Sequence, residues 1–245
     1  SLRHWHLNDP GVVPNVVQTG AGAPTGITVY EGRLLPRAYW DQVIHCESGV
    51  NVVRAYPVQE SGAGYAGQSL QVMKSRKDRS FRPVDVAVAP DGSLFVSDWY
   101  DSVVGGFQQR DIGKGRLYRI APEGSRYVPG KPAYDSPVTA VAALKNPNYC
   151  VRYKAWQVLR GMGVKAEKAL LDLYQSLNPR HRARALWLLG KIAGRGGHYV
   201  QLAAGDTNPD IRITALRLAG QVGIPLPVLI DRLAKDPSAR VRREC

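Results

Sequence analysis

The second half of the chain repeats with a period of thirty residues. Four arginines mark the period, at Arg152, Arg182, Arg212 and Arg242, and a small side chain follows three residues after each, at Ala155, Ala185, Ala215 and Cys245. A proline turn precedes each arginine, at Asn146-Pro147, Asn178-Pro179, Asn208-Pro209 and Asp236-Pro237. Such a repeat predicts a helical solenoid, in which stacked helices bury apolar faces that no single unit can bury alone.

Apolar residues in this half recur at spacings of three and four, which is the period of one helix face. A first helix is predicted at Pro137, with Ser136 as its N-cap and the proline at the first helical position. Three helix pairs are predicted after it, at 148–161 with 165–177, at 179–193 with 199–204, and at 209–222 with 227–234.

Between residues 23 and 122 the apolar period changes to two, which predicts strands. Strands are expected at 84–89, 93–98 and 116–120, and the turn between the first two is Pro90-Asp91-Gly92. An earlier group of strands is expected at 26–30, 42–46 and 51–56. A succession of strand, tight turn, strand, loop and strand is typical of one β-propeller blade, so two blades are predicted.

The predicted fold class is therefore all-β followed by all-α. We expect the C-terminal blades of a partial β-propeller over residues 1–130, a linker over 131–136 and HEAT-type helical repeats over 137–245. Two blades cannot close a ring, and their edges would need further strands to cover them. The last repeat also lacks a polar capping helix. We therefore expect the chain to be a fragment of a longer polypeptide.

The net charge of +13 is unevenly distributed. Residues 1–136 hold 15 Lys and Arg against 13 Asp and Glu, whereas residues 137–245 hold 18 against 7. A basic surface on the helices could attract nucleic acid, anionic lipid or an acidic protein. Alternatively, the repeated arginines cross-link successive turns through carbonyls and carboxylates. No apolar run is long enough to cross a membrane.

The three cysteines, Cys46, Cys150 and Cys245, form neither a Cys-x-x-Cys pair nor a Cys-x-x-Cys-His haem attachment. Cys150 and Cys245 fall on predicted helices at positions where apolar or small residues recur. We expect both to be buried structural thiols.

Candidate chemistry lies where the innermost strands of the predicted blades begin and end. Arg82 and Asp85 stand at the entry to one strand, His45 ends another, and Asp98 follows a third. Converging there, His45, Asp85 and Asp98 could act as general bases or metal ligands, with Arg82 binding a cofactor. The alternative is that Asp85 and Asp98 hydrogen-bond turn backbones at strand ends.

The pair His4 and His6 could ligate a metal from one strand face. The sequence offers no third ligand beside it, so no metal site is predicted. The loop glycines Gly105-Gly106 precede no helix, which argues against a phosphate cradle there.

Several segments carry a resemblance to a known family. The run Ala23-Pro24-Thr25-Gly26-Ile27, residues 81–98 and residues 115–120 resemble the last blades of sugar-dehydrogenase-type six-bladed propellers. Residues 3–11, 98–106 and 148–156 make the chain similar to large bacterial proteins called membrane-bound dehydrogenases, common in planctomycetes and verrucomicrobia. Those proteins join such a propeller to HEAT repeats and end in a c-type cytochrome domain.

The resemblance implies an exported, periplasmic or membrane-associated protein that oxidises a sugar or alcohol and passes electrons to haem c. It implies pyrroloquinoline quinone and Ca²⁺ in the parent protein, a catalytic His before Ser1, and helical repeats that serve as a scaffold. The fragment itself would be inactive. Residues 45–51 lack the Trp and the basic residues of the corresponding loop in sugar-oxidising relatives, so no quinone ligand can be carried over.

The partners implied are a small-molecule substrate in the parent protein and a protein bound on the HEAT surface. Nucleic acid is not expected as a partner. Membrane contact would come only from regions outside this chain. Two alternatives stay open. The basic helices could form a protein- or nucleic-acid-binding module, which for DNA would show steep salt dependence. The propeller could instead belong to a Ca²⁺-dependent lactonase or hydrolase that uses Asp85 and Asp98 as oxygen ligands.

Overall fold

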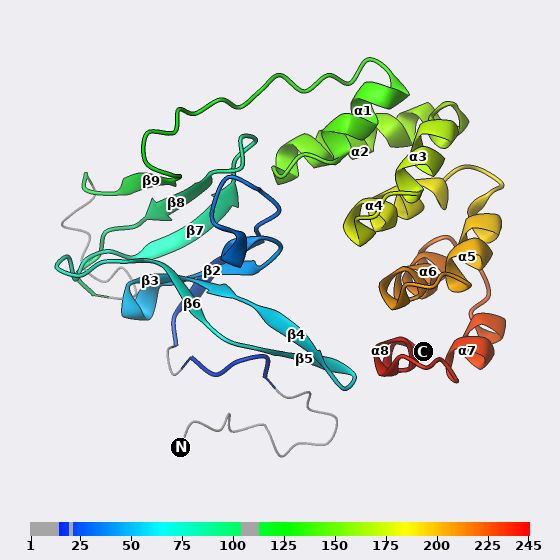
Figure 1. The fold of residues 1–245 in the computed structure, drawn as a ribbon, viewed down its shortest axis with the longest axis horizontal. Coiled ribbons are helices and arrows are strands. Elements are labelled where there is room, and N and C mark those ends of the chain that lie inside the picture. The colour runs from blue at the N-terminus through cyan, green and yellow to red at the C-terminus, as the bar shows by residue number, and fades with distance from the viewer. Residues whose placement is uncertain (1–14, 20–21, 104–112) are drawn as a thin grey trace. The chain divides into compact units, whose positions relative to one another are not determined.

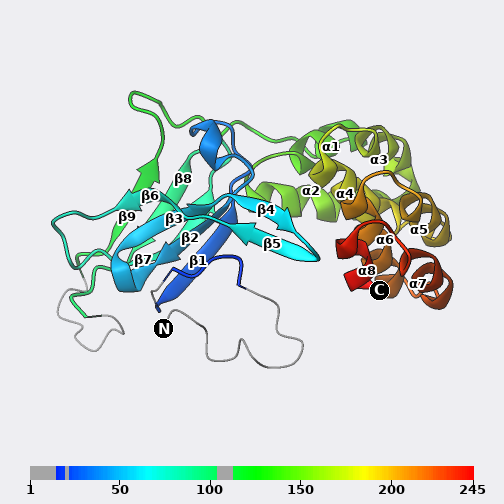
Figure 2. The same ribbon diagram turned by 60° about the horizontal axis from the view of Figure 1, so that its bottom comes forward.

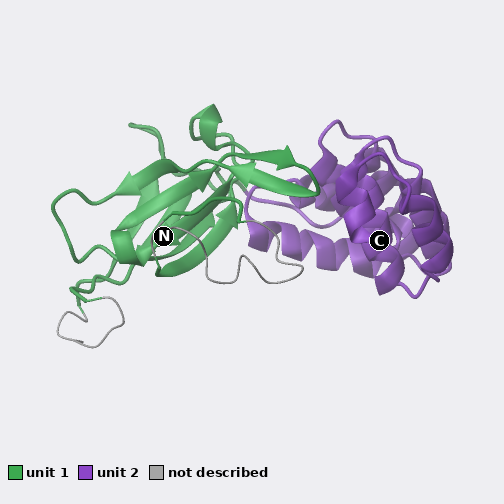
Figure 3. Ribbon diagram, turned by 90° about the horizontal axis from the view of Figure 1, so that it is seen from below, with its two compact units in different colours: residues 1–130 green, residues 131–245 purple. Residues whose placement is uncertain are grey.

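The computed structural model describes residues 15–19, 22–103 and 113–245. It divides into two compact units, residues 1–130 and 131–245 (Figure 3). Each unit has a hydrophobic core of its own. The predicted features at His4, His6 and Gly105-Gly106 lie outside the described residues.

The first sheet has four antiparallel strands in the order β1, β2, β3, β6 (Figure 1). These strands are β1 (Pro24–Val29), β2 (Val43–Glu47), β3 (Val52–Tyr56) and β6 (Leu70–Lys74). A hairpin of β4 (Val58–Ser61) and β5 (Gly64–Gly67) lies between β3 and β6 in the chain. The three strands predicted here are confirmed. The fourth strand and the hairpin were not predicted: β6 is short and ends at a run of charged residues, and β4 of the hairpin is exposed along its whole length.

The second sheet has three antiparallel strands: β7 (Pro83–Val88), β8 (Leu94–Asp98) and β9 (Arg116–Ile120), with β8 in the middle. The predicted turn between β7 and β8 is confirmed. Gly92 adopts a φ of 88°, which a side chain would disfavour, and Ser93 N–H donates to Asp91 Oδ1 at 2.9 Å. In the described part of the chain the strands form open sheets and no closed propeller.

The two sheets pack face to face. Apolar side chains that alternate along the strands meet between them, namely Ile44, Cys46, Val53 and Ala55 from the first sheet and Val86, Val88, Leu94 and Val96 from the second. Figure 2 shows β1 and β7 lying next to each other across this boundary. Two hydroxyls bond across it to the Pro83 carbonyl, from Thr25 at 2.8 Å and Ser48 at 2.7 Å.

The second unit is helical, as predicted. Its helices are α1 (Pro137–Leu144), α2 (Tyr149–Met162), α3 (Glu167–Tyr174), α4 (Pro179–Leu189), α5 (Gly196–Ala204), α6 (Pro209–Gln221), α7 (Pro227–Leu233) and α8 (Ala239–Glu244). Short 3-10 helices add Arg37–Tyr39 and Ser48–Val50 in the sheet unit and Gly163–Ala166 before α3. The cap at Ser136 is confirmed: its hydroxyl accepts from Thr139 N–H, and Thr139 in return bonds the Ser136 N–H.

The helices pair differently from the prediction. The most extensive contacts join α1 to α2, α3 to α4 and α5 to α6, and α4, α6 and α8 stack in succession. The predicted pairs were therefore displaced by one helix. The reason lies in the turns at 145–148, 175–178 and 205–208, which are short and closed by side-chain bonds, so each chain reversal places a helix against its predecessor.

The small residues of the repeat are core residues, since Ala155, Ala185 and Ala215 are fully buried. The predicted burial of Cys150 and Cys245 is wrong, because both are exposed. Cys150 is the second residue of α2 and follows the exposed Tyr149, and Cys245 follows the last turn of α8.

Candidate functional site

The carboxylate of Asp98, at the end of β8, is fully buried and closely bonded. Its Oδ1 accepts from the backbone N–H of Arg82 at 2.8 Å and of Tyr100 at 2.9 Å. Its Oδ2 pairs with the guanidinium of Arg116, 2.9 Å from Nε and 2.7 Å from Nη2. Asp98 therefore hydrogen-bonds backbone N–H groups at a strand end, which is the alternative role named in the sequence analysis.

Arg82, at the entry to β7, is also buried and lies directly beside Asp98 in space. Its guanidinium donates to the carbonyls of Ser48 and Ser102, both at 3.3 Å. These bonds tie the loop before β7 to the first sheet and to the segment after β8. The two terminal nitrogens of Arg82 thus serve backbone carbonyls, whereas its buried Nε has no hydrogen-bond partner among the described residues.

Asp85 lies in β7 and is exposed. Its Oδ1 accepts from the N–H of Val86 at 2.8 Å. Its backbone presses against β1, because a Cβ on Gly26 would lie 2.5 Å from the Asp85 Cα. The two sheets therefore approach closely at Gly26 and Asp85.

His45 lies in β2, on the face of the first sheet opposite to the packed core. Its Nδ1 is 3.1 Å from the hydroxyl of Tyr56, so the two share a hydrogen bond. Burial lowers the pKa of His45, which keeps the imidazole neutral near pH 7. Burial also raises the pKa of Tyr56, so its hydroxyl stays protonated.

The four candidates do not converge on one site. Arg82 and Asp98 meet through a backbone bond, whereas Asp85 is engaged at the sheet boundary and His45 on the opposite face of the first sheet. Among the described residues no group of three or more His, Cys, Asp or Glu could hold a metal ion. The residues present therefore do not fit Ca²⁺ at Asp85 and Asp98, since the Asp98 oxygens are already occupied by N–H donors.

Sequence analysis missed two residues here, Arg116 and Asp78. Arg116 is the cross-strand partner of Asp98 in the β8–β9 register, and it also pairs with Asp78 at 2.7 Å. That hydrogen bond lowers the pKa of Asp78. The available signal was the Arg that opens the strand after Asp98, since opposite charges on antiparallel strands often face each other.

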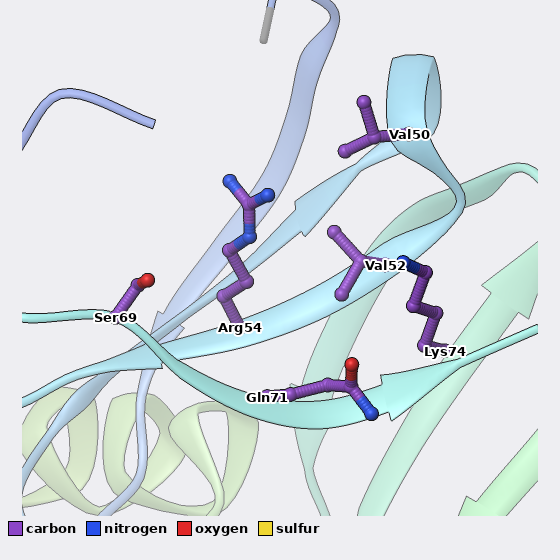
Figure 4. Close-up of a pocket in the computed structure, with 6 residues that line it drawn as sticks. All are labelled: Val50, Val52, Arg54, Ser69, Gln71 and Lys74. Carbon is purple, nitrogen blue, oxygen red and sulfur yellow. The ribbon is translucent and has the colours of Figure 1, made fainter. Parts of the chain in front are cut away.

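A polar pocket lies on the face of the first sheet that carries His45. Its volume is about 230 Å³, and it is lined by Val50, Val52, Arg54, Ser69, Gln71 and Lys74 (Figure 4). Arg54 lies on β3, and its cross-strand neighbours are His45 on β2 and Gln71 on β6. Sequence analysis assigned no site role to these lining residues, because they come from two segments that are separated in the chain, residues 50–54 and 69–74.

The repeated arginines of the helical unit bond to the chain itself. Each of Arg152, Arg212 and Arg242 donates to two carbonyls in the turn before its own helix. Arg212 also forms a bidentate pair with Asp236 of the next turn, with both N–O distances at 2.7 Å. Arg182 bonds the Tyr174 carbonyl at 3.0 Å and pairs with Asp206. The interpretation that these arginines cross-link successive turns is confirmed for Arg182 and Arg212, whereas the carbonyls bonded by Arg152 and Arg242 belong to the turn before their own helix.

The comparisons with known proteins identify a family for the first unit. A family model described as a domain of unknown function (DUF7133) matches residues 2–124. The chain belongs to this family. The DUF7133 match covers every strand of both sheets and ends before α1. A comparison with curated proteins finds no match. Across the described residues, no helix has the length and apolar character needed to cross a membrane.

Proposed function

We propose that this chain is the non-catalytic, structural part of an exported sugar or alcohol dehydrogenase. The two DUF7133 sheets contribute blades to a propeller, and the HEAT-type helices form a scaffold that positions an electron-accepting haem domain. Pyrroloquinoline quinone, Ca²⁺ and haem c belong to other parts of the parent protein in this proposal. The dehydrogenase assignment rests on the family resemblance described above.

The observation that carries the structural role is the bonding of Asp98. A general base or metal ligand needs an oxygen that can reach substrate or metal. Both oxygens of Asp98 instead accept bonds from protein N–H groups inside the sheet unit. Both Nη atoms of Arg82 donate to the carbonyls of Ser48 and Ser102, which leaves only its buried Nε without a partner among the described residues.

The helical unit supports the scaffold role. Successive turns are joined by Arg182 with Asp206 and by Arg212 with Asp236, pairs whose members are mostly buried. A third link joins Arg195 to Glu167 at 2.8 Å. Pairs that connect consecutive repeats restrict the sliding of one helix layer over another, and a scaffold that sets a distance between domains needs this restriction.

A second candidate function, a protein-binding helical module, has one observation in its favour. Tyr149, Tyr153 and Trp156 stack along α2, with ring centroids 6.2 and 6.3 Å apart. The two tyrosines are 67% and 49% exposed. Exposed aromatic side chains are enriched at protein interfaces. The nucleic-acid alternative has less support, because most arginines of the unit already bond to carbonyls or carboxylates of the chain.

The test uses the product of the gene that encodes this chain, with and without added pyrroloquinoline quinone and Ca²⁺. We expect quinone-dependent reduction of its haem by a sugar or an alcohol. Asp98→Asn should leave the rate per folded molecule unchanged. The matched control is Asp41→Asn, at an exposed carboxylate that pairs with Arg33.

Two results would contradict the proposal. If no substrate reduces haem in the presence of quinone, the dehydrogenase assignment is wrong. If Asp98→Asn abolishes turnover while the melting temperature stays the same, the non-catalytic assignment of these residues is wrong.

A further inference from the structure

The pocket beside β3 and β6 holds a guanidinium nitrogen with an unmet bonding requirement. Nη1 of Arg54 is buried, and no hydrogen-bond acceptor for it is found among the residues that the structure describes. Buried N–H groups of folded proteins nearly always have a partner, because an unpaired one loses the hydrogen bonds it would make to water. An acceptor from outside the chain would satisfy this requirement.

The other polar groups of the pocket can also donate to an acceptor. Lys74 brings a second positive charge, and Ser69 and Gln71 bring a hydroxyl and an amide. Figure 4 shows these side chains around the open space beside Arg54. The pocket therefore combines two cationic and two neutral donors.

An acidic side chain on the same sheet, Glu47, has one carboxylate oxygen engaged by backbone N–H groups. Glu47 is the cross-strand partner of Val52, and its Oε1 accepts from the N–H of Ala23 at 2.8 Å and of Gly49 at 3.4 Å. Its carboxylate thus caps the short helix at Ser48–Val50. None of the residues that line the pocket is acidic.

We propose that this pocket binds the phosphate group of a small organic phosphate. Two cations match a dianion, and the guanidinium of Arg54, which also bonds the side chain of Tyr56, has Nη1 left to donate to a phosphate oxygen. Ser69 and Gln71 donate to the remaining oxygens. Val50 and Val52 form an apolar wall against which the organic part packs, and a volume of about 230 Å³ leaves room for it. The site lies on the face opposite the packed core, so it is independent of the proposed redox function.

The test is calorimetric titration of the chain with inorganic phosphate and with glycerol phosphate at constant ionic strength. We expect both to bind, and glycerol phosphate to bind more tightly. Arg54→Gln and Lys74→Gln should each weaken binding at least tenfold. The matched control carries Arg76→Gln and Lys77→Gln, which remove charges of the same kinds from exposed positions of the neighbouring loop.

Equal affinity in the pocket variants and the control would overturn the proposal, because it would show general attraction to a basic protein. Failure of the wild-type chain to bind either phosphate would overturn it as well. If circular dichroism shows that Arg54→Gln does not fold, Lys74→Gln decides the question, since Lys74 is exposed and its loss leaves the core intact. Binding is measured without turnover, so the outcome does not depend on the dehydrogenase proposal.

Discussion

At the scale of single residues, charged side chains near strand ends serve packing before chemistry. Asp98 is the clearest case, because a fully buried carboxylate is stable only when it is paired and hydrogen-bonded. Arg116 supplies the charge and two backbone N–H groups supply the bonds. Tyr100 lies beside the pair, with the Arg116 guanidinium 4.5 Å from its ring centroid.

Gly26 is the residue that lets the two sheets approach. A Cβ at this position would meet the Asp85 Cα at 2.5 Å, and that contact is with backbone, which cannot rotate away. We expect Gly26→Ala to lower the free energy of unfolding by about 1–3 kcal/mol in urea denaturation. Gly113→Ala is the control, since a Cβ there meets nothing within 4 Å among the described residues. Equal stability of the two variants would contradict the close packing.

The pair of Arg212 and Asp236 gives the protein a predictable response to acid. Hydrogen bonds from Arg212 lower the pKa of Asp236 below its usual 3.8. A carboxyl whose pKa is lower in the folded state stabilises the fold above its unfolded pKa and loses this effect as the pH falls through the folded pKa. Asp236→Asn should therefore cost about 1–3 kcal/mol at pH 7, and the difference from wild type should shrink below pH 3.8.

The measurement for Asp236 is thermal unfolding of both proteins from pH 7 down to pH 2. Asp231→Asn, at an exposed position of α7, is the matched control and should stay within about 0.5 kcal/mol of wild type at every pH. A difference between Asp236→Asn and wild type that is constant with pH would show that the charge of Asp236 does not act in this way.

At the scale of elements, the helical repeat depends on small residues between stacked helices. Ala215 of α6 is fully buried, and α6 contacts both α4 and α8. We expect Ala215→Leu to destabilise the helical unit by about 1–3 kcal/mol because the added carbons force these helices apart. Ala142→Leu is the control, since Ala142 is an exposed residue of α1. Equal unfolding midpoints in urea would contradict the packing role.

The elements differ in how well the sequence predicts them. Strong local signals were sufficient for the Asp91-Gly92 turn, the Ser136 cap and the buried alanines of the repeat. The hairpin β4–β5 was not predicted, because β4 is exposed along its whole length and has no apolar alternation. The strand β6 was not predicted, because it is short and runs into a charged segment. The helix pairing was displaced because it depends on how the turns fold back, and periodicity alone does not contain that information.

The candidate site was less predictable than the fold. The strand-end positions of Arg82 and Asp98 were predicted correctly, whereas His45 lies in the middle of β2 and not at its end. The chemistry of Arg82 and Asp98 depends on partners far away in the chain. Arg116 lies 18 residues from Asp98, and Ser48 lies 34 residues from Arg82. Whether a carboxylate is free or paired follows from the register between strands, which the sequence around one strand cannot determine.

At the scale of the whole molecule, the two units have separate cores, one between the sheets and one among the helices. We expect residues 131–245 to fold without the sheet unit, with a cooperative thermal transition close to that of the helices in the full chain. Circular dichroism and calorimetry of the isolated unit measure this. A helical unit that is unfolded alone but folded in the full chain would show that its stability depends on the sheets.

The central claim is that Asp98 holds the sheet unit together by pairing with Arg116. A double-mutant cycle with Asp98→Asn and Arg116→Gln measures this pairing directly in urea unfolding. We predict that each single variant is destabilised and that the double variant loses less than the sum of the two, with a coupling of about 1–3 kcal/mol. Strictly additive losses would contradict the claim and return Asp98 to the residues available for chemistry.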